Sequence, residues 1–193
     1  MVAIDATTGK LRWRFAASGP VDTPPTVAGE SVVFGSADGW AYCLRADDGK
    51  LVWKHRGAPG ERLIGAFGGI ESAWPIHGCV LVRDGKAYLT AGRSSFLDGG
   101  IFAGELDVRT GKVLSEKVLA SDHDMKVDKG RDPLEDTGLL DDILVAGEKG
   151  IHMRRAVVFG DAGELAAPSG TPRAGGVLRS TGPGGLLGDT WNA

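Results

Sequence analysis

The sequence repeats a short segment along its length, and this repeat constrains the fold more than any other feature. Residues 3–13 read AIDATTGKLRW, and residues 43–53, forty positions later, read CLRADDGKLVW. A third copy lies at residues 105–114, and a more divergent fourth copy lies at 158–165. A period near forty residues in strand-rich units is typical of β-propeller blades.

Each copy predicts a strand, a tight turn and a second strand. A short apolar run leads into the pattern Asp-x-x-Thr-Gly, or a close variant of it. The Asp and Thr side chains bond to the turn backbone, and a glycine takes a positive φ without strain. The predicted turn glycines of the first three copies are Gly9, Gly49 and Gly111.

Between the first two copies, the sequence predicts one complete four-stranded antiparallel blade at residues 24–55. Two hairpin turns, at residues 28–30 and 38–39, separate runs that are rich in β-branched and aromatic residues. The expected strands, innermost first, are residues 24–28, 31–35, 40–45 and 50–55.

The predicted fold class is all-β, a partial β-propeller of about three to four four-stranded antiparallel blades within residues 1–165. Its other parts are a half blade at 1–15, a blade at 75–119 with strands at 80–82, 87–91, 101–107 and 113–119, and a degenerate blade at 142–165. In the degenerate blade, residues 151–159 are either one long strand or two strands without a clear turn. Residues 120–141 are interpreted as a polar loop between blades, and the Gly- and Pro-rich residues 166–193 as a connection and the truncated start of a next segment.

The blade at 24–55 resembles the pyrroloquinoline-quinone-type repeat of the quinoprotein alcohol dehydrogenase-like propellers. The matching residues are Asp38, Gly39, Tyr42, Leu44, Ala46, Gly49 and Trp53. The resemblance is specific up to about residue 120, and it departs where Arg45 replaces an Asp and Leu114 replaces a Trp. It extends to uncharacterised bacterial propellers and to the outer-membrane assembly lipoprotein of this superfamily. It implies an intact protein of roughly seven or eight blades, with an export signal and a periplasmic or cell-surface location.

The resemblance also implies structural roles for Trp13 and Trp53, each four residues after a turn glycine. In the family, such a ring packs between adjacent blades and against the neighbouring turn. We therefore expect these tryptophans and turn glycines to dock blades rather than to bind a ligand. Cys43 and Cys79 occupy strand-like positions in successive units without metal-site spacing, and we expect buried free thiols there rather than a disulfide.

Both ends of the chain predict a fragment of a longer protein. Met1 enters directly at the end of a third blade strand, and residues 187–193 stop before another strand can pair with them. A closed propeller needs about four to eight blades. The alternative is a ring completed by dimerisation or by strands of a partner, because exposed sheet edges favour pairing.

Composition and charge exclude several classes of partner. The net charge is -3 and the basic residues are scattered among acidic ones, so nucleic acid binding is not predicted. No run approaches the ~20 apolar residues of a membrane-spanning helix, and no signal peptide is visible at the first residues. The 31 glycines are explained by a turn-dense all-β structure.

Two long insertions in the second blade, at residues 56–79 and 92–100, mark the candidate site. In a propeller, the connection that precedes a blade and the second hairpin of that blade emerge on one face, so both insertions belong to the same face. Function in such folds depends on loops that a rigid scaffold carries. The residues expected to converge there are Arg62, Glu71, Trp74, His77, Arg93, Ser95 and Asp98.

These residues have a ligand-binding interpretation and a structural one. In the first, Glu71 with Arg93 or Asp98 orients a polar ligand, Trp74 stacks on a sugar or quinone ring, and His77 titrates near neutral pH. In the second, Glu71 and Arg93 form an ion pair that locks the two loops, Trp74 fills the gap between blades, and His77 is an ordinary loop residue. No metal site is predicted, since the acidic run around His123 lacks the spacing of a calcium loop.

The sequence favours a non-catalytic propeller module that acts as a protein- or glycan-binding scaffold without a cofactor. The alternative is a fragment of a quinoprotein dehydrogenase. In that family, the quinone binds with a calcium ion held by Glu and Asn, beside a catalytic Asp and an adjacent cysteine pair. Here no Cys-Cys pair occurs, and Asn192 is the only asparagine. A polysaccharide hydrolase or lyase acting through Glu71 and Asp98 needs two carboxylates roughly 5 to 10 Å apart.

Overall fold

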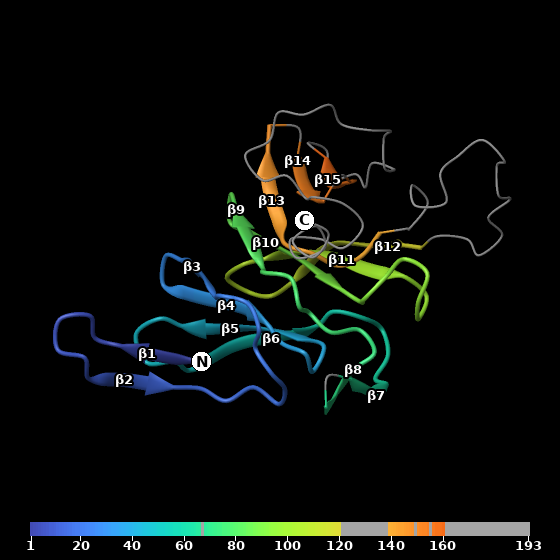
Figure 1. Cartoon of the computed structure of the whole chain (residues 1–193). Helices are drawn as coiled ribbons and strands as arrows, with labels where there is room; N and C mark the ends of the chain where they lie inside the picture. Colours follow the sequence, from blue (N-terminus) through green and yellow to red (C-terminus); the bar gives the residue numbers. More distant parts are fainter. Residues whose placement is uncertain (67, 121–138, 149, 155, 161–193) are drawn as a thin grey trace, which may run out of the picture.

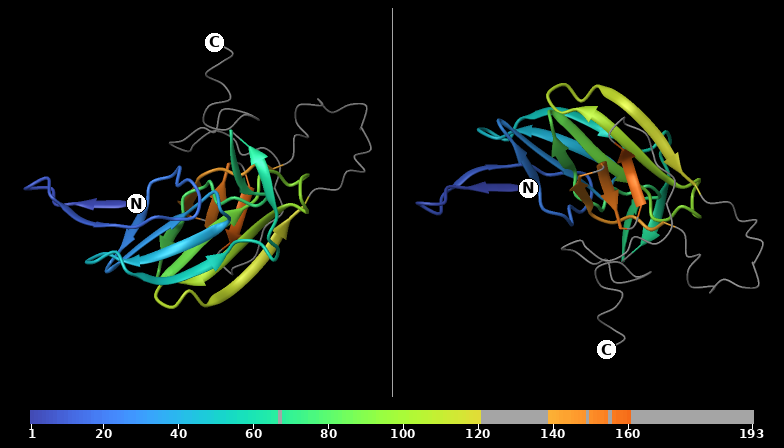
Figure 2. Two further views of the ribbon diagram at one scale, coloured as in Figure 1. Left: turned by 90° about the horizontal axis from the view of Figure 1, so that it is seen from below. Right: turned by 90° about the horizontal axis from the view of Figure 1, so that it is seen from above.

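The computed structural model describes residues 1–66, 68–120, 139–148, 150–154 and 156–160, and this part contains strands and no helix. The strands form antiparallel sheets that follow one another in chain order (Figure 1). The first is a pair, β1 (Val2–Ile4) and β2 (Leu11–Arg14), which projects from the remainder of the described part in both views of Figure 2. The predicted all-β, partial β-propeller fold is confirmed, and the described sheets do not close a ring.

The structure contains two complete four-stranded sheets. Each of their strands begins and ends within two residues of the predicted bounds. The first consists of β3 (Thr26–Ala28), β4 (Ser31–Gly35), β5 (Trp40–Arg45) and β6 (Leu51–Arg56). The second consists of β9 (Leu81–Arg83), β10 (Lys86–Ala91), β11 (Ile101–Asp107) and β12 (Val113–Leu119). In each sheet the strands pair in sequence order, so consecutive hairpins build the whole blade.

The next sheet consists of β13 (Leu144–Gly147), β14 (Gly150–Met153) and β15 (Ala156–Gly160). The sequence analysis predicts either one long strand or two strands for residues 151–159. The structure has two, β14 and β15. The chain reverses at Arg154, which has a φ of 54°. The turn gave no clear sequence signal because an arginine occupies a conformation that glycine and asparagine usually fill. The predicted strand positions at 161–165, the loop with His123 and the segment 166–193 lie outside the described residues.

The insertion at residues 56–79 contains a further hairpin that the sequence analysis does not predict. Strands β7 (Leu63–Ala66) and β8 (Gly69–Ser72) pair only with each other, from Leu63 opposite Ser72 to Ala66 opposite Gly69. Gly68, with a φ of 79°, supplies the positive dihedral angle that the tight turn needs. This hairpin carries Glu71 of the candidate site.

Each complete sheet is buried on both faces because alternate residues of its strands point to opposite sides. In β5, Tyr42 and Leu44 pack toward the β1–β2 pair, whereas Ala41 and Cys43 pack toward the second blade. The second blade is likewise covered by the first blade on one side and by the β13–β15 sheet on the other. The inner strand β9 contacts both β3 and β13, as expected for blades arranged around a common axis.

The repeated turns use side chains to hold the backbone. Asp5 Oδ1 accepts hydrogen bonds from the backbone N–H and hydroxyl of Thr8, and Asp107 Oδ1 does the same for Thr110. These bonds hold the pKa of both carboxyl groups below its usual value. In the second copy the pair is replaced by Arg45 and Asp48, whose side chains form an ion pair across the same turn. The departure from the repeat pattern therefore preserves a turn-closing contact.

Trp13 and Trp53 join successive sheets through equivalent contacts. Trp13 Nε1 donates to the backbone oxygen of Ala46 at 2.8 Å, and Trp53 Nε1 donates to that of Val108 at 2.9 Å. Both rings are buried, with 9% and 8% of their surface exposed. Each ring lies so close to the turn glycine of the next sheet that a Cβ there would be 2.6 to 2.7 Å from ring carbons.

Candidate functional site

The two insertions of the second blade meet, and charged side chains join them. Arg93 donates to Glu71 Oε1 and, at 3.4 Å, to the backbone oxygen of Ser72. Arg62 forms an ion pair with Asp98. The Glu71 side chain is 7% exposed, which makes Glu71–Arg93 the more buried of the two pairs.

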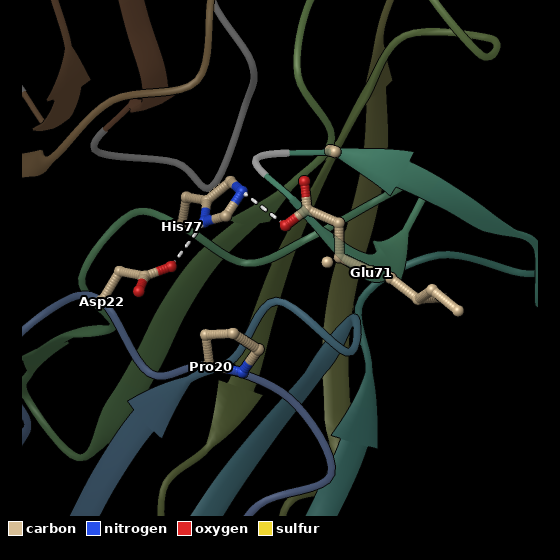
Figure 3. A pocket seen from close by; sticks show the side chains of 7 residues that line it. Pro20, Asp22, Glu71 and His77 are labelled. Carbon is tan, nitrogen blue, oxygen red and sulfur yellow. Dashed lines mark ion pairs between the residues drawn. The ribbon is translucent and has the colours of Figure 1, made fainter.

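A pocket of about 490 Å³ opens beside Glu71. Its lining residues are Pro20, Asp22, Ala66, Gly69, Ile70, Glu71 and His77, and we call it the Asp22–His77 pocket. Three segments supply them: the connection before β3, the β7–β8 hairpin, and the connection before β9. Figure 3 shows the His77 ring between the carboxylates of Asp22 and Glu71. The pocket is therefore built where two blades and an insertion come together.

Hydrogen bonds to the β4–β5 hairpin position the pocket walls. The backbone oxygen of Pro20 accepts from Ser36 Oγ at 3.0 Å and from the Ala37 N–H at 2.9 Å. On the opposite wall, the Ser72 N–H donates to the backbone oxygen of Ala37 at 2.8 Å. Because one turn of the first blade holds both walls, their separation is fixed by the rigid scaffold.

His77 bridges the two acidic groups of the pocket. Its Nδ1 lies 3.3 Å from Asp22 Oδ2, and its Nε2 lies 3.5 Å from Glu71 Oε2. The second contact is within ion-pair distance, yet Nε2 is buried and makes no hydrogen bond. Arg93 Nε, behind Glu71, is also buried without a hydrogen-bond partner. Buried polar atoms are nearly always hydrogen-bonded, so these exceptions call for an explanation.

Of the predicted site residues, Glu71 and His77 line the pocket, and Arg93 supports Glu71 from behind. Trp74 lies elsewhere: its Nε1 donates to the backbone oxygen of Asp98 at 2.8 Å, and its ring meets Phe102 edge to face. Ser95 is buried, and its Oγ accepts from the Leu139 N–H at 2.8 Å. Ligand binding by these residues stays a prediction, whereas the Glu71–Arg93 ion pair of the structural interpretation is present.

Asp22 is the site residue that sequence reasoning missed. It lies four residues before β3, as His77 lies four residues before β9. Repeat equivalence was thus an available signal, because connections at the same place in successive blades approach the same axis. Asp22 was overlooked since its connection carries no insertion.

A third buried polar atom without a hydrogen-bond partner, in a carboxylate, lies at the start of the next blade. Asp141 Oδ1 accepts from Thr90 Oγ1 at 2.6 Å, while Oδ2 has no partner. The residue as a whole is partly exposed, but Oδ2 is buried. Burial raises the pKa of this carboxyl group to about 7. Asp141 is not a lining residue of the Asp22–His77 pocket.

The described residues fit a calcium-bound quinone poorly. No group of three or more His, Cys, Asp or Glu side chains in that part of the chain has an arrangement that could hold a metal ion. Glu71 is the most buried carboxylate of the pocket, and its Oε1 already forms an ion pair with Arg93. Cys43 and Cys79 are both free thiols, as predicted, although Cys79 is only partly buried.

Comparison with known proteins places the chain in a family. The family model described as outer membrane protein assembly factor BamB matches residues 1–164. The dehydrogenase subunit of alcohol dehydrogenase (quinone) from Gluconacetobacter polyoxogenes is 33% identical over 124 residues, covering 58% of this chain and 16% of that protein. The corresponding subunit from Gluconobacter oxydans (strain 621H) is 32% identical with the same coverage. The chain thus spans about one sixth of the length of these relatives.

A solved structure supports the fold. Quinohemoprotein alcohol dehydrogenase ADHIIG from Pseudomonas putida HK5 has a TM-score of 0.50 and 21% identity, over 61% of this chain and 17% of that chain.

In the described residues, no helix is long and apolar enough to span a membrane. The resemblance inferred from the repeat is confirmed by the family match, and the chain belongs to the family described as outer membrane protein assembly factor BamB.

Proposed function

We propose that this chain is a non-catalytic propeller module that binds a polar group of a protein or glycan in the Asp22–His77 pocket. The observation that carries the proposal is a cavity of ligand size, about 490 Å³, which has Asp22, Glu71 and His77 in its lining. The carboxylate that a ligand can reach is that of Asp22, whose side chain is 54% exposed. A few polar groups on a mostly apolar lining are typical of small-ligand sites.

The reactive groups of the lining are two carboxylates and one imidazole, and each already faces a charged partner. Among the described lining residues there is no serine, threonine, cysteine, lysine or tyrosine. Covalent catalysis by any of these nucleophiles is therefore unsupported. Asp98, the second carboxylate of the hydrolase interpretation, forms its ion pair with Arg62 and does not line the pocket.

The pocket combines hydrogen-bond acceptors with carbon surface. Asp22, Glu71 and His77 supply the polar groups, and Pro20, Ala66 and Ile70 supply apolar wall. Sugars present hydroxyl donors beside C–H faces, and peptide side chains present similar combinations. Such a lining matches the general character of small-ligand sites, which place a few polar groups on a mostly apolar surface.

Titration of the full chain with a small panel of probes tests this function. The panel contains neutral, amino and acidic monosaccharides, a tri-lysine peptide and a tri-alanine peptide, followed by calorimetry. We expect saturable binding of at least one probe, loss of that binding in His77→Ala, and retention in His55→Ala, a histidine outside the pocket. Binding of no probe, or equal binding by both variants, contradicts the proposal.

The second candidate function is a segment of a quinone-dependent alcohol dehydrogenase. Its support is the 33% identity to the dehydrogenase subunit of alcohol dehydrogenase (quinone) over 124 residues. Its weakness is the poor fit of the described side chains to a calcium-bound quinone. Titration with pyrroloquinoline quinone and calcium chloride, followed by absorbance and melting temperature, separates the two functions. A saturable spectral change with a higher melting temperature favours the dehydrogenase segment, and no change favours the binding module.

A further inference from the structure

The β7–β8 hairpin is attached to the rest of the molecule by few groups. Within the described residues it pairs with no other strand, and its Leu63 and Ile70 side chains are 60% and 73% exposed. Only Glu71 and Ser72, at its end, are buried. The Ser72 N–H donates to the backbone oxygen of Ala37, a contact that does not change with pH. Glu71 is the one ionisable anchor of the hairpin, because no other residue of the two strands carries a titratable side chain.

A proton on the His77 ring explains how the hairpin is held. Arg93 pairs with Glu71 Oε1, whereas Glu71 Oε2 lies 3.5 Å from His77 Nε2. On the other side of the ring, Nδ1 lies 3.3 Å from Asp22 Oδ2 (Figure 3). An imidazolium ion carries a proton on both nitrogens, so it donates toward both carboxylates at once. This form of the ring also accounts for the buried Nε2, which otherwise has no hydrogen-bond partner.

A neutral imidazole cannot make both contacts, because it has one N–H and one lone pair. Whichever nitrogen keeps the proton, the other sets its lone pair against a carboxylate oxygen. The negative charges of Asp22 and Glu71 are then left without a cation between them. Imidazole is the side chain that ordinarily changes its charge between about pH 5 and 8. The link between the hairpin and the connection before β3 therefore depends on pH.

Most other charged or titratable groups on the neighbouring segments keep their charge through this range. Arg93 stays protonated. Cys79, on the same connection as His77, faces the backbone oxygen of Leu144, and burial raises the pKa of its thiol. Two further pairs are already formed: Arg62 with Asp98 and Arg154 with Asp142. None of these groups replaces the proton on the ring.

Asp141 is the exception, because it titrates in the same range. It lies in the connection before β13, and its N–H donates to the backbone oxygen of Arg93 at 3.2 Å. Burial raises the pKa of its carboxyl group to about 7. A test of His77 has to separate the two groups, and a variant at each position does so.

We propose that protonated His77 is a pH-dependent clasp, which holds the β7–β8 hairpin against the connection before β3 and keeps the Asp22–His77 pocket closed on that side. Loss of the proton loosens the hairpin, which supplies Ala66, Gly69 and Ile70 to the lining, and opens the pocket. Control of ligand access rests on the proposed binding function. The clasp is a property of the chain alone and is tested without a ligand.

Hydrogen–deuterium exchange of the full chain, followed by mass spectrometry at about pH 5.5 and 8.5, tests the clasp. Observed rates are divided by the intrinsic exchange rate at each pH, so that they report the opening of the hairpin. We expect protection of the β7–β8 amides to fall about fivefold or more between the two pH values, because one charge-assisted hydrogen bond is lost. Protection of β5 should stay constant. In His77→Gln, which carries no charge at either pH, protection of the hairpin should be low throughout.

Two variants are the controls. Asp141→Asn removes the other group that titrates in this range, and His55→Gln removes a histidine outside the pocket. Both should keep the pH dependence of the wild-type hairpin. Equal protection at the two pH values in the wild type, the same fall in His77→Gln, or loss of the fall in Asp141→Asn overturns the clasp. A fall in protection that depends on His77, in a chain that binds no probe of the panel, supports the clasp and overturns only the binding function.

Discussion

The two faces of this propeller segment use their side chains differently. On the face of the repeated turns, the same contacts recur from copy to copy, as in Asp5 with Thr8 and Asp107 with Thr110. On the face of the insertions, each contact occurs once, and His77 Nε2 and Arg93 Nε are left without hydrogen bonds. Repeated, satisfied contacts hold the blades together. The single contacts leave buried polar atoms unsatisfied.

The largest effect should follow from removing a blade-docking ring of the repeat face. Trp53→Ala loses a side chain that is 8% exposed and its hydrogen bond to Val108. Large-to-small changes at buried aromatic residues cost about 3–5 kcal/mol. We expect a decrease of this size in the free energy of unfolding, measured by urea titration. Probe binding to the remaining folded fraction should not change, and a loss below about 1 kcal/mol would argue against blade docking by Trp53.

Two turn glycines, Gly9 and Gly49, allow the cost of backbone strain to be measured separately from the cost of overlap with a tryptophan ring. Gly9 and Gly49 have nearly equal φ values, 68° and 69°, but only Gly49 lies against a tryptophan ring. Alanine at either position should cost about 1–2 kcal/mol for the left-handed conformation. Gly49→Ala should cost about 1–3 kcal/mol more, because its Cβ would overlap the Trp13 ring. Equal unfolding free energies for the two variants would show that the ring yields without cost.

The repeat face was largely predictable from the sequence, since its determinants are local. Asp-x-x-Thr-Gly and Asp38-Gly39 encode turns by their own dihedral preferences, and strand alternation sets the two buried faces. Even the replacement of the usual Asp by Arg45 left the turn in place, because Asp48 supplies an opposite charge. Local signals of this kind need no knowledge of distant residues.

The insertion face was predictable only in part. The coincidence of the two insertions correctly indicated that Glu71 and Arg93 lie together. The β7–β8 hairpin and the role of Asp22 were missed, because both depend on contacts between segments far apart in sequence. Trp74 Nε1 donates to the backbone oxygen of Asp98 and Ser95 Oγ accepts from the Leu139 N–H, and ligand binding by both residues stays a prediction. The type of a residue and its position in an insertion predict that it lies near the site, but they do not predict which atoms its side chain contacts.

An intermediate effect is expected at Asp141, whose carboxylate belongs to neither the turns nor the pocket. Its pKa is about 7 in the folded chain, against an ordinary value of 3.8. Between these values the folded state holds a proton that the unfolded state has lost, so the stability of the wild type falls as pH rises from about 4 to 7. Asp141→Asn removes this dependence. Its unfolding free energy should exceed that of the wild type by on the order of 2 kcal/mol at pH 8, at about 1.4 kcal/mol per pKa unit with allowance for partial exposure.

The control for Asp141→Asn is the same comparison at pH 4, where the carboxyl group is protonated in the folded state and close to half protonated in the unfolded state, so the difference should shrink. Urea titrations at pH 4, 6 and 8 measure it. A constant difference across this range would mean that Asp141 ionises as an ordinary surface carboxyl group, and that its raised pKa has no part in stability.

The smallest effect is expected at the exposed ion pair between Arg62 and Asp98, in contrast to the more buried Glu71–Arg93 pair. Arg62 is 54% exposed on its side chain, and its Cζ lies 5.5 Å from the centre of the Trp74 ring. Exposed ion pairs and cation–π contacts each contribute about 0–1 kcal/mol. Arg62→Met should therefore lower the unfolding free energy by less than about 1 kcal/mol, with less effect still in 0.5 M salt, where the Debye length is below about 8 Å. Because Arg62 does not line the pocket, probe affinity should be unchanged; a loss of affinity comparable to that of His77→Ala would instead extend the binding site to Arg62 and Trp74.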